Sequence, residues 1–508
     1  MRLGIDVEST ADVLIVGYGA AGAAAALRAA ELGGSALILE RYQADEHTPS
    51  TKMSGGLIMG VRDVEPATTY LDRCAGGLVP VEVSHAWAEK ASDLVDWLDR
   101  QGTDLSLLRT GGAEHPSFKG AEAIEVYCQS ILRDGRRVHA LDDNLAGTGG
   151  AGHGDSRFRT GRELFAALHS AVSSRRQVGI VWGARGQRLL QDAKGRVVAL
   201  EAVMDGRVHT FLGRRAIILS NGGFEFDEPL KTDYFRAAPV HFYGNPANTG
   251  DGVRMAQQVG ADLWHMTQLA GRAVGHFQCT DGTWRNFVIY VEPGGYVITD
   301  KHGRRFANEQ LQAKLRHDFY YELLTYDSQN EEYPRVPCYW FFDQSRLGAR
   351  PLTSLASGVV GVGLYEWSPD NRRELEMGWI HEGTSIADVA RKAGVGDPER
   401  AAATVAAYNR ICADPSAIDP HGRPRDSLLP LTGPPFYCVT LYPGGSNTSG
   451  GPRRNEHAQI LDAFGVPIPA LYGAGELGQA IGLLYPADGS NLSEAFCFGQ
   501  LAVEHALG

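Results

Sequence analysis

The segment ADVLIVGYGAAGAAAALRAAELGGSALILE, which spans residues 11–40, constrains the fold more than any other part of the chain. Its pattern predicts a short buried strand over 13–16, a helix over 20–32 that is rich in strong helix formers, and a second strand over 36–39. A strand, a helix and a strand in this order form the crossover unit of a parallel sheet. We therefore expect an α/β domain at this end of the chain.

Gly17, Gly19 and Gly22 follow the first strand in the spacing G-x-G-x-x-G. The first glycine permits a tight turn, the second lets the backbone approach a pyrophosphate at the positive end of the helix, and the third allows helix and strand to pack closely. Glu40 ends the second strand, where it is placed to accept hydrogen bonds from a ribose and to disfavour a 2′-phosphate. The unit predicts a dinucleotide site but does not distinguish FAD from NAD.

Composition excludes several classes of protein. The 508 residues predict two or three domains, and the net charge of -12 argues against nucleic acid as a partner. The seven cysteines form no CxxC pair, so we expect no disulfide framework, no metal site and a cytoplasmic location. Arg28 and Glu31 interrupt the apolar stretch 13–39, so we expect no membrane span there. The first residues lack a basic segment followed by an apolar run, so we expect no signal peptide.

Patterns further along divide the chain into three parts. Helices are predicted over about 84–100 and directly after residue 159, and alternating strands meet at a hairpin turn at Asp205–Gly206. From about residue 264 the chain is dense in aromatic residues and changes character. The predicted parts are the first part of a cofactor-binding domain (1–265), an inserted cap domain (266–430) and the second part of the first domain (431–508).

Five segments resemble, in the same order, motifs of the fumarate reductase and succinate dehydrogenase flavoprotein superfamily, which includes a 3-ketosteroid dehydrogenase branch. They are STKMSGG (50–56), AIILSNGGFEFD (216–227), GNPANTGDGVRMAQQVGADL (244–263), GYVITDKHGRRFANE (295–309), and YGAGELGQ (472–479) with DGSNLSEAFCFG (488–499). The resemblance spans nearly the whole chain. It implies FAD rather than NAD, and a Rossmann-like α/β FAD-binding domain with an inserted α+β domain that caps the substrate.

The motif and the resemblance together predict the residues that contact FAD. These are Gly17, Gly19, Ala20, Ala21, Gly22, Glu40, Arg41, Thr51, Ser54, Gly55, Gly56, Ala184, Asn221, Gly222, Asp251, Gly475, Glu476, Ser490, Asn491 and Leu492. Asp251 is expected to cap a helix that starts near Val253. Some relatives attach the flavin covalently to a histidine just before the glycine pair. Because His47 precedes Gly55 by a longer spacing, we expect a surface loop histidine and non-covalent FAD.

The resemblance also suggests three catalytic residues. Asn447, in YPGGSNTSGGP, stands where dicarboxylate reductases of the superfamily carry a histidine, so a cationic partner for a carboxylate is lost. Arg316 follows the N-E pair at 308–309, several residues later than the proton-donating arginine of those reductases. Tyr485 resembles a tyrosine of the steroid dehydrogenases. Each of the three could also be an ordinary residue of a turn, a solvent-exposed helix or the core, and this alternative stays open. His317 lies beside Arg316 in the sequence, and the ordinary pKa of histidine suits proton transfer.

Three functions are compatible with these patterns. The first is dehydrogenation or reduction of a carbon–carbon bond α,β to a carbonyl group. The substrate would be a small molecule that is bulky and apolar, such as a ketosteroid, and the reaction would need an external electron acceptor or donor. The apolar substrate is suggested by the aromatic residues of the cap: Trp264, Phe277, Trp284, Phe287, Tyr290, Tyr296, Phe319, Trp340, Phe341 and Phe342. The second is reduction of a carboxylated alkene such as fumarate or urocanate. The third is an FAD-carrying electron-transfer subunit.

Overall fold

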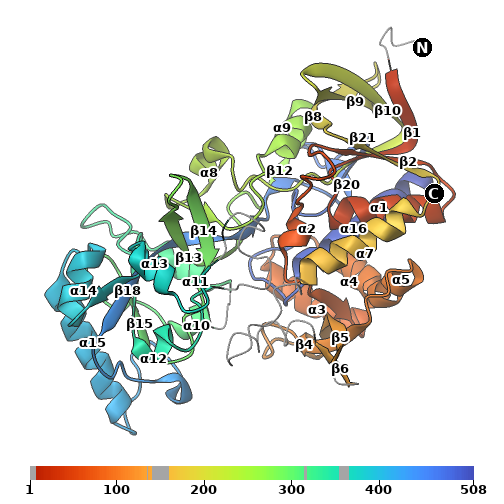
Figure 1. The fold of residues 1–508 in the computed structure, drawn as a ribbon. Coiled ribbons are helices and arrows are strands. Elements are labelled where there is room, and N and C mark those ends of the chain that lie inside the picture. Colours follow the sequence, from red (N-terminus) through yellow and green to blue (C-terminus); the bar gives the residue numbers. More distant parts are fainter. Residues whose placement is uncertain (1–6, 134–135, 140–159, 314–316, 354–364, 366) are drawn as a thin grey trace.

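The chain forms two lobes (Figure 1). The computed structural model describes residues 7–133, 136–139, 160–313, 317–353, 365 and 367–508. Arg316 therefore lies outside the described residues. One lobe contains both ends of the described chain, and the other is built from the middle of the sequence.

The first lobe is organised by a sheet whose strands follow the order β20-β21-β10-β1-β2-β7. Its strands are β1 (Val7–Val16), β2 (Ala36–Glu40), β7 (Val178–Trp182), β10 (Arg207–Leu219), β20 (Gln459–Leu461) and β21 (Pro467–Gly473). β1 is parallel to β2 and to β10, and β10 is parallel to β21. Strands from the two ends of the sequence thus share one sheet, and the predicted crossover unit at 11–40 is present.

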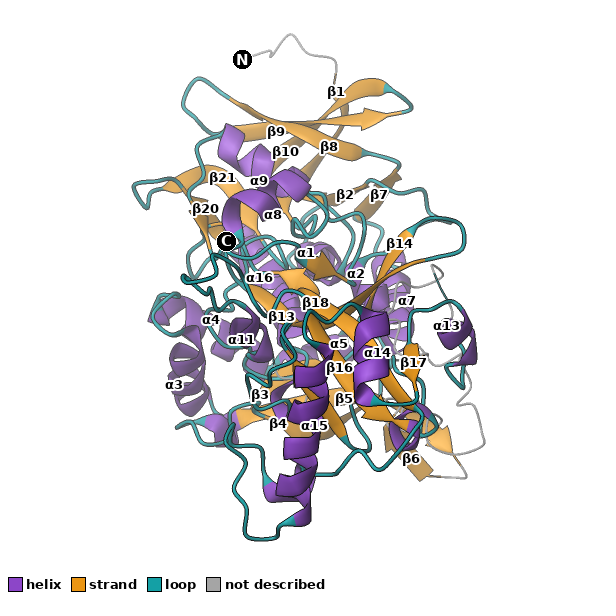
Figure 2. Ribbon diagram, turned by 90° about the vertical axis from the view of Figure 1, so that its left-hand side faces the viewer, coloured by secondary structure: helices purple, strands orange, loops and turns teal. Residues whose placement is uncertain are grey.

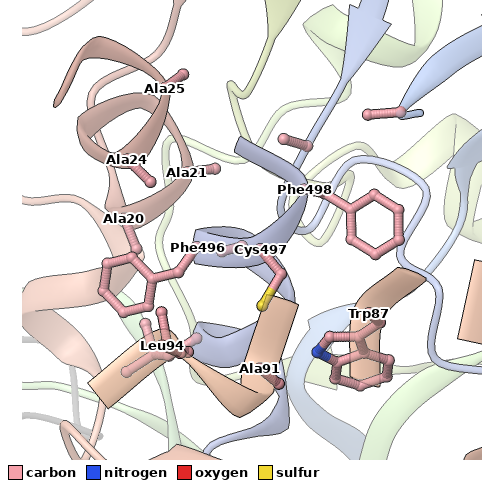
Figure 3. Packing of buried hydrophobic residues seen from close by; sticks show 14 of the residues in the cluster. Ala20, Ala21, Ala24, Ala25, Trp87, Ala91, Leu94, Phe496, Cys497 and Phe498 are labelled. Atoms are coloured by element: carbon pink, nitrogen blue, oxygen red, sulfur yellow. The ribbon is translucent and has the colours of Figure 1, made fainter. Parts of the chain in front are cut away.

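Two helices of this lobe, from opposite ends of the sequence, pack closely because small residues lie at their contact. α1 (Ala20–Glu31) is buried on nearly all sides and lies next to α16 (Ser490–Leu507), which returns from the C-terminal segment. A Cβ atom on Gly499 would lie 2.5 Å from the carbonyl oxygen of Ala21, so only glycine allows the two helices to come this close. On its other side α16 packs against α4 (Val81–Ser92), where Trp87 fills the contact (Figure 3).

Antiparallel strands and further helices complete the first lobe. β8 (Arg185–Gln191) and β9 (Val197–Met204) extend the sheet, and β9 turns into β10 at the predicted hairpin of Asp205–Gly206. A separate sheet contains β3 (Ile58–Val61), β4 (Leu107–Gly112), β5 (Ile124–Arg133) and β6 (Arg136–His139), and the neighbouring helices are α3 (Val64–Ala75), α5 (Leu94–Arg100) and α7 (Thr160–Ser173). The single helix expected over about 84–100 is two helices, α4 and α5, because the helical turns are interrupted at Asp93.

The second lobe surrounds a sheet of order β14-β13-β18-β16-β15, with β11 and β17 paired to β18. Its strands are β11 (His241–Phe242), β13 (Leu269–Gln278), β14 (Trp284–Val288), β15 (Tyr296–Thr299), β16 (Cys338–Asp343), β17 (His381–Gly383) and β18 (Phe436–Thr448). The predicted division at residues 265 and 430 stays a prediction. β18, which follows the second of these boundaries, pairs with strands of the middle segment.

Alternating side chains of β16 form two cores. Tyr339 and Phe341 pack with α14 (Ile386–Ala393) and α15 (Pro398–Ala413), which lie across one face of the sheet (Figure 2). Trp340 and Phe342 point to the opposite face and join a second aromatic core, as the twofold repeat of a strand requires. Among the described residues, no helix is both long and apolar enough to cross a membrane.

Candidate functional site

A cavity of about 540 Å³ is lined by residues of both lobes. Its walls come from the glycine turn before α1, the α2 segment (Ser50–Met53), the start of α9 (Asp251–Gln258), β13 and the N-terminal end of α16. Of the residues predicted to contact FAD, all except Gly22 and Ser490 line this cavity. Those two lie immediately behind its wall, so the predicted set forms one continuous surface, and its contact with FAD stays a prediction.

The glycine turn leaves room for a bound group at one position only. Gly17 has a φ of 100°, and a Cβ atom there would lie 2.6 Å from the carbonyl oxygen of Ser220. A Cβ atom on Gly22 would lie 2.2 Å from the carbonyl oxygen of Gly17, so this glycine allows helix and turn to pack. Gly19 is different, because its added Cβ atom would meet no protein atom closer than the Thr51 hydroxyl at 3.4 Å. The free space before the helix therefore fits a pyrophosphate.

Glu40 offers an ionised carboxylate at the end of β2. Its two oxygens accept hydrogen bonds from the backbone N–H groups of Tyr18 (2.9 Å) and Tyr42 (3.0 Å). Burial alone would raise the pKa of Glu40, but His47 and these N–H groups outweigh burial, so the pKa lies below its ordinary value. A charged acceptor at this position fits the hydroxyl groups of a ribose.

His47 is buried, not a surface loop residue, so that expectation is wrong. Only 4% of its surface is exposed, and its ring stacks on Tyr18 with the centroids 5.4 Å apart. Phe165 and Trp182 meet the ring edge to face, and Nε2 lies 3.6 Å from the Glu40 carboxylate. The aromatic partners come from distant segments, so the local sequence gave no sign of this burial.

Asp251 does not cap α9 as expected. The helix begins at Asp251 itself, and Gly250, in the left-handed conformation, occupies the capping position. The Asp251 carboxylate instead accepts two hydrogen bonds from Arg185, at 2.7 and 2.8 Å, and lies 3.8 Å from Arg41. The two arginines therefore fix this carboxylate at the cavity wall.

Glu476 lies in the middle of the cavity wall and is held by two donors. Asn248 donates to its carboxylate at 2.7 Å and Ser50 donates at 3.2 Å. Burial and the neighbouring Glu225 carboxylate raise the pKa of Glu476. Glu225 is itself fully buried and accepts a hydrogen bond from the Thr448 hydroxyl at 2.9 Å. Both carboxyl groups therefore bind a proton more tightly than they would in water.

Neutral polar groups meet at the far end of the cavity. Asn447 accepts a hydrogen bond from the Asn491 side chain at 2.7 Å and donates to Gln479 at 3.2 Å. The Tyr485 hydroxyl lies 3.5 Å from the backbone nitrogen of Asn491, at the start of α16. Burial raises the pKa of Tyr485, so this phenol stays protonated. The sequence predictions of Tyr485 and Asn447 thus converge in space.

Four charged or titratable residues at this end were not among the predicted site residues: Glu114, Arg272, His317 and Asp488. Arg272 Nη2 lies 2.9 Å from His317 Nε2, and the His317 ring lies against Tyr485 with the centroids 4.1 Å apart. Glu114 lies 3.7 Å from His317 Nδ1, and that histidine lowers the pKa of Glu114 against the effect of burial. These residues come from four separate segments, so spacing in the sequence could not reveal the group.

Only one of the ten cap aromatics considered from the sequence lines the cavity, and it is Tyr290. Trp284 is 53% exposed, and the other eight are buried in the cores. The apolar wall at this end consists instead of Tyr243, Val288, Tyr290 and Ala313.

Comparison with known proteins extends this description. A family sequence model described as FAD binding domain matches residues 12–492. The chain is 26% identical to 4-oxocyclohexanecarboxylate 2-dehydrogenase of Sinomonas cyclohexanicum, over 97% of this chain and 92% of that protein. It is 24% identical to urocanate reductase of Eggerthella lenta, over 97% of this chain and 74% of that protein.

The fold is similar to a crystal structure of 3-ketosteroid delta1-dehydrogenase from Sterolibacterium denitrificans in complex with 1,4-androstadiene-3,17-dione. The TM-score is 0.80, at 21% sequence identity, and the match covers 98% of this chain and 99% of the other. The similarity includes both lobes, since nearly the whole of each chain is aligned.

Proposed function

Because the chain belongs to the FAD-binding domain family and is an FAD-dependent oxidoreductase that acts on carbon–carbon bonds, we propose that its substrate is a ketone or an enone. The reaction forms or removes the double bond α,β to the carbonyl group. The observation that carries this proposal is the group of neutral donors around Tyr485 at the end of the cavity. A carbonyl oxygen is neutral in the ground state and gains negative charge as a neighbouring C–H bond breaks, which such donors stabilise.

The residues of the cavity wall would hold FAD in one orientation. The free space at Gly19 fits the pyrophosphate, and Glu40 fits the ribose of the adenosine. Asn491 and Leu492, at the positive end of α16, line the other end of the cavity and would hold the flavin ring. When bound there, FAD supplies the hydride acceptor or donor of the reaction. The described residues near the ring are those that bind and orient the substrate.

FAD binding is proposed to be non-covalent. His47, the histidine nearest before Gly55, packs beside Glu40 and the aromatic rings of Tyr18 and Trp182. Its ring is therefore at the adenosine end of the proposed site and not at the flavin end. Unfolding the protein in acid should release the yellow cofactor into the soluble fraction.

Tyr485 and Asn447 are proposed to act differently. The Tyr485 hydroxyl is protonated and points to the helix start, so it can donate a hydrogen bond to the substrate oxygen. Asn447 is bonded to Gln479 and Asn491 and keeps the Asn491 side chain in place. Tyr243, Val288 and Tyr290 provide apolar contact for the rest of the substrate. The wall accordingly favours a cyclic, largely apolar ketone.

A reductase of carboxylated alkenes is the second candidate. The observation in its favour is Arg272, whose guanidinium group lines the cavity beside His317 and could bind a carboxylate. Arg316 would be the proton donor in this version. Replacement of Arg316 by Ala should then remove nearly all turnover, and unchanged turnover would exclude this version.

Turnover also requires a second redox partner. A ketone that is desaturated leaves two electrons on FAD, so an external acceptor must remove them; enone reduction requires an external donor instead. A cytoplasmic location stays a prediction from the cysteine usage.

Anaerobic titration of the purified flavoprotein tests the proposal. We expect a saturated cyclic ketone, such as 4-oxocyclohexanecarboxylate or a 3-ketosteroid, to bleach the flavin absorbance, or an enone to reoxidise the photoreduced flavin. Urocanate and fumarate serve as the comparison substrates. Reoxidation by these acids together with no response to any ketone or enone would reject the first candidate in favour of the second.

A further inference from the structure

The proposed reaction requires a base that the sequence did not provide. Breaking a C–H bond next to a carbonyl group releases a proton, which must be accepted within hydrogen-bond distance of that carbon. Tyr485 stays protonated and cannot accept it. The base is therefore expected among the remaining titratable groups of the cavity wall.

Four carboxylates line the cavity: Glu40, Asp251, Glu476 and Asp488. The first three are held by protein donors, as described above. Within the described part of the chain, the carboxylate of Asp488 forms no hydrogen bond or ion pair with the protein. An acidic side chain that the protein leaves unpaired in a concave site is available to a bound molecule.

The local backbone aims Asp488 at the reactive end. Its neighbour Ala487 and the helix residue Ser490 are fully buried, whereas the Asp488 side chain is exposed to the cavity. Ser490 fixes this turn, because its hydroxyl donates to the carbonyl oxygen of Ala487 at 2.6 Å and accepts from its N–H at 3.0 Å. The turn lies between Tyr485 and the start of α16, so the carboxylate is adjacent to the proposed carbonyl site.

We propose that Asp488 is the catalytic base that takes the proton from the carbon α to the substrate carbonyl group. The α C–H bond breaks, its electron pair becomes the carbon–carbon double bond of an enolate, and the proton forms an O–H bond on Asp488. The Tyr485 hydroxyl and the N-terminal end of α16 stabilise the enolate oxygen. The step needs no oxidant, because it is a proton transfer only. The inference rests on the proposed function, since it requires a ketone substrate.

The surroundings give Asp488 a suitable basicity. Burial and the Glu114 carboxylate raise its pKa, whereas His317 and Arg272 act in the opposite direction. A carboxylate with a raised pKa is a stronger base than one in water. Among the described residues, the titratable and charged groups near it are Arg272, His317 and Tyr485, which line the cavity, and Glu114, which lies behind His317.

Exchange of the substrate's α hydrogens with solvent deuterium isolates this step. The holoenzyme is photoreduced under anaerobic conditions, so that it cannot accept a hydride, and is incubated in D2O with the saturated ketone 4-oxocyclohexanecarboxylate. Proton NMR measures the loss of the α signals. We expect Asp488→Asn to slow the enzyme-catalysed exchange at least 100-fold, the scale of general base catalysis. The control Asp281→Asn, in an exposed turn outside the cavity, should leave the rate unchanged.

The pH profile separates a base from a structural residue. Removal of the negative charge in Glu114→Gln should shift the midpoint of exchange to lower pH, because Glu114 raises the pKa of Asp488. An unchanged rate of exchange in Asp488→Asn would overturn the assignment. If exchange is lost in His317→Asn but normal in Asp488→Asn, the base is His317 instead. If the wild-type protein neither exchanges α hydrogens nor transfers electrons with any ketone, the proposed function itself is wrong, whatever the role of Asp488. An unchanged flavin absorption spectrum and an unchanged melting temperature establish that each variant is folded and holds FAD.

Discussion

Two alanine substitutions in the glycine turn should separate cofactor binding from folding. In Gly19→Ala the new methyl group meets no protein atom closer than 3.4 Å, and the residue has a φ of -106°, which alanine adopts without strain. In Gly22→Ala the methyl group would lie 2.2 Å from the carbonyl oxygen of Gly17, so backbone atoms must move. The first change fills the space proposed for the pyrophosphate, and the second disturbs the turn itself.

The expected magnitudes follow from these contacts. A hydrogen bond between a backbone N–H group and a charged phosphate contributes about 1.5–3 kcal/mol. Loss of one such bond in Gly19→Ala weakens FAD binding by about 10- to 150-fold. The apoprotein should keep its stability or gain up to about 1 kcal/mol, because alanine restricts the unfolded chain. Gly22→Ala should lose about 1–3 kcal/mol or more by overpacking.

Two measurements test the pair. Thermal unfolding of the apoproteins reports stability, and quenching of flavin fluorescence on titration with FAD reports affinity. Gly433→Ala is the matched control, because its added methyl group meets no atom within 4 Å and it lies outside the cavity. If Gly19→Ala binds FAD like the wild type, the pyrophosphate does not lie at this turn. If Gly22→Ala melts like the wild type, the close packing of helix and turn is not a source of stability.

Three further outcomes are expected at the cavity wall. Tyr485→Phe should lower kcat by about 100- to 1000-fold with little change in KM, because the hydroxyl acts mainly on the developing negative charge; an equal loss in binding of a ketone inhibitor would contradict this. Asn447→Ala removes the bond that holds Asn491 and should lower kcat/KM by about tenfold, about 1.4 kcal/mol in steady-state kinetics. Burial raises the pKa of Glu225 to about 7, above its value of about 4.5 in the unfolded chain. The folded apoprotein therefore binds this proton more tightly than the unfolded chain does, and the resulting stabilisation is lost as pH rises through about 7. Melting temperatures between pH 5 and 8 should therefore fall less steeply for Glu225→Gln than for the wild type.

The sequence was sufficient to predict the fold, the cofactor and the type of reaction, and the comparisons confirm all three. The reason is that the determinants are local. The G-x-G-x-x-G turn requires glycine for backbone reasons that are visible at Gly17 and Gly22. Segments such as 50–56 and 472–479 keep their order along the chain, and each lines the same cavity.

Predictions that depended on distant partners were less successful. The exposure expected for His47 failed because its ring is covered by Phe165 and Trp182, more than a hundred residues away. The capping role expected for Asp251 failed because Arg185 competes for its carboxylate. Aromatic density in the cap indicated a lined pocket, but most of these rings fill the cores, since alternate residues of β16 face opposite sides of the sheet.

The reactive end is the part that sequence reasoning could reach least, and its construction explains why. It forms where the two lobes meet: Arg272 and His317 come from the cap, whereas Tyr485 and Asp488 come from the turn before α16. α16 is positioned by its contact with α1, so the side of the site that we propose for the flavin is fixed by the packing of the first lobe. We therefore expect substitutions on the cap side to change the recognised substrate without loss of FAD. Such a division is consistent with relatives whose substrates are a ketone in one case and a carboxylated alkene in another.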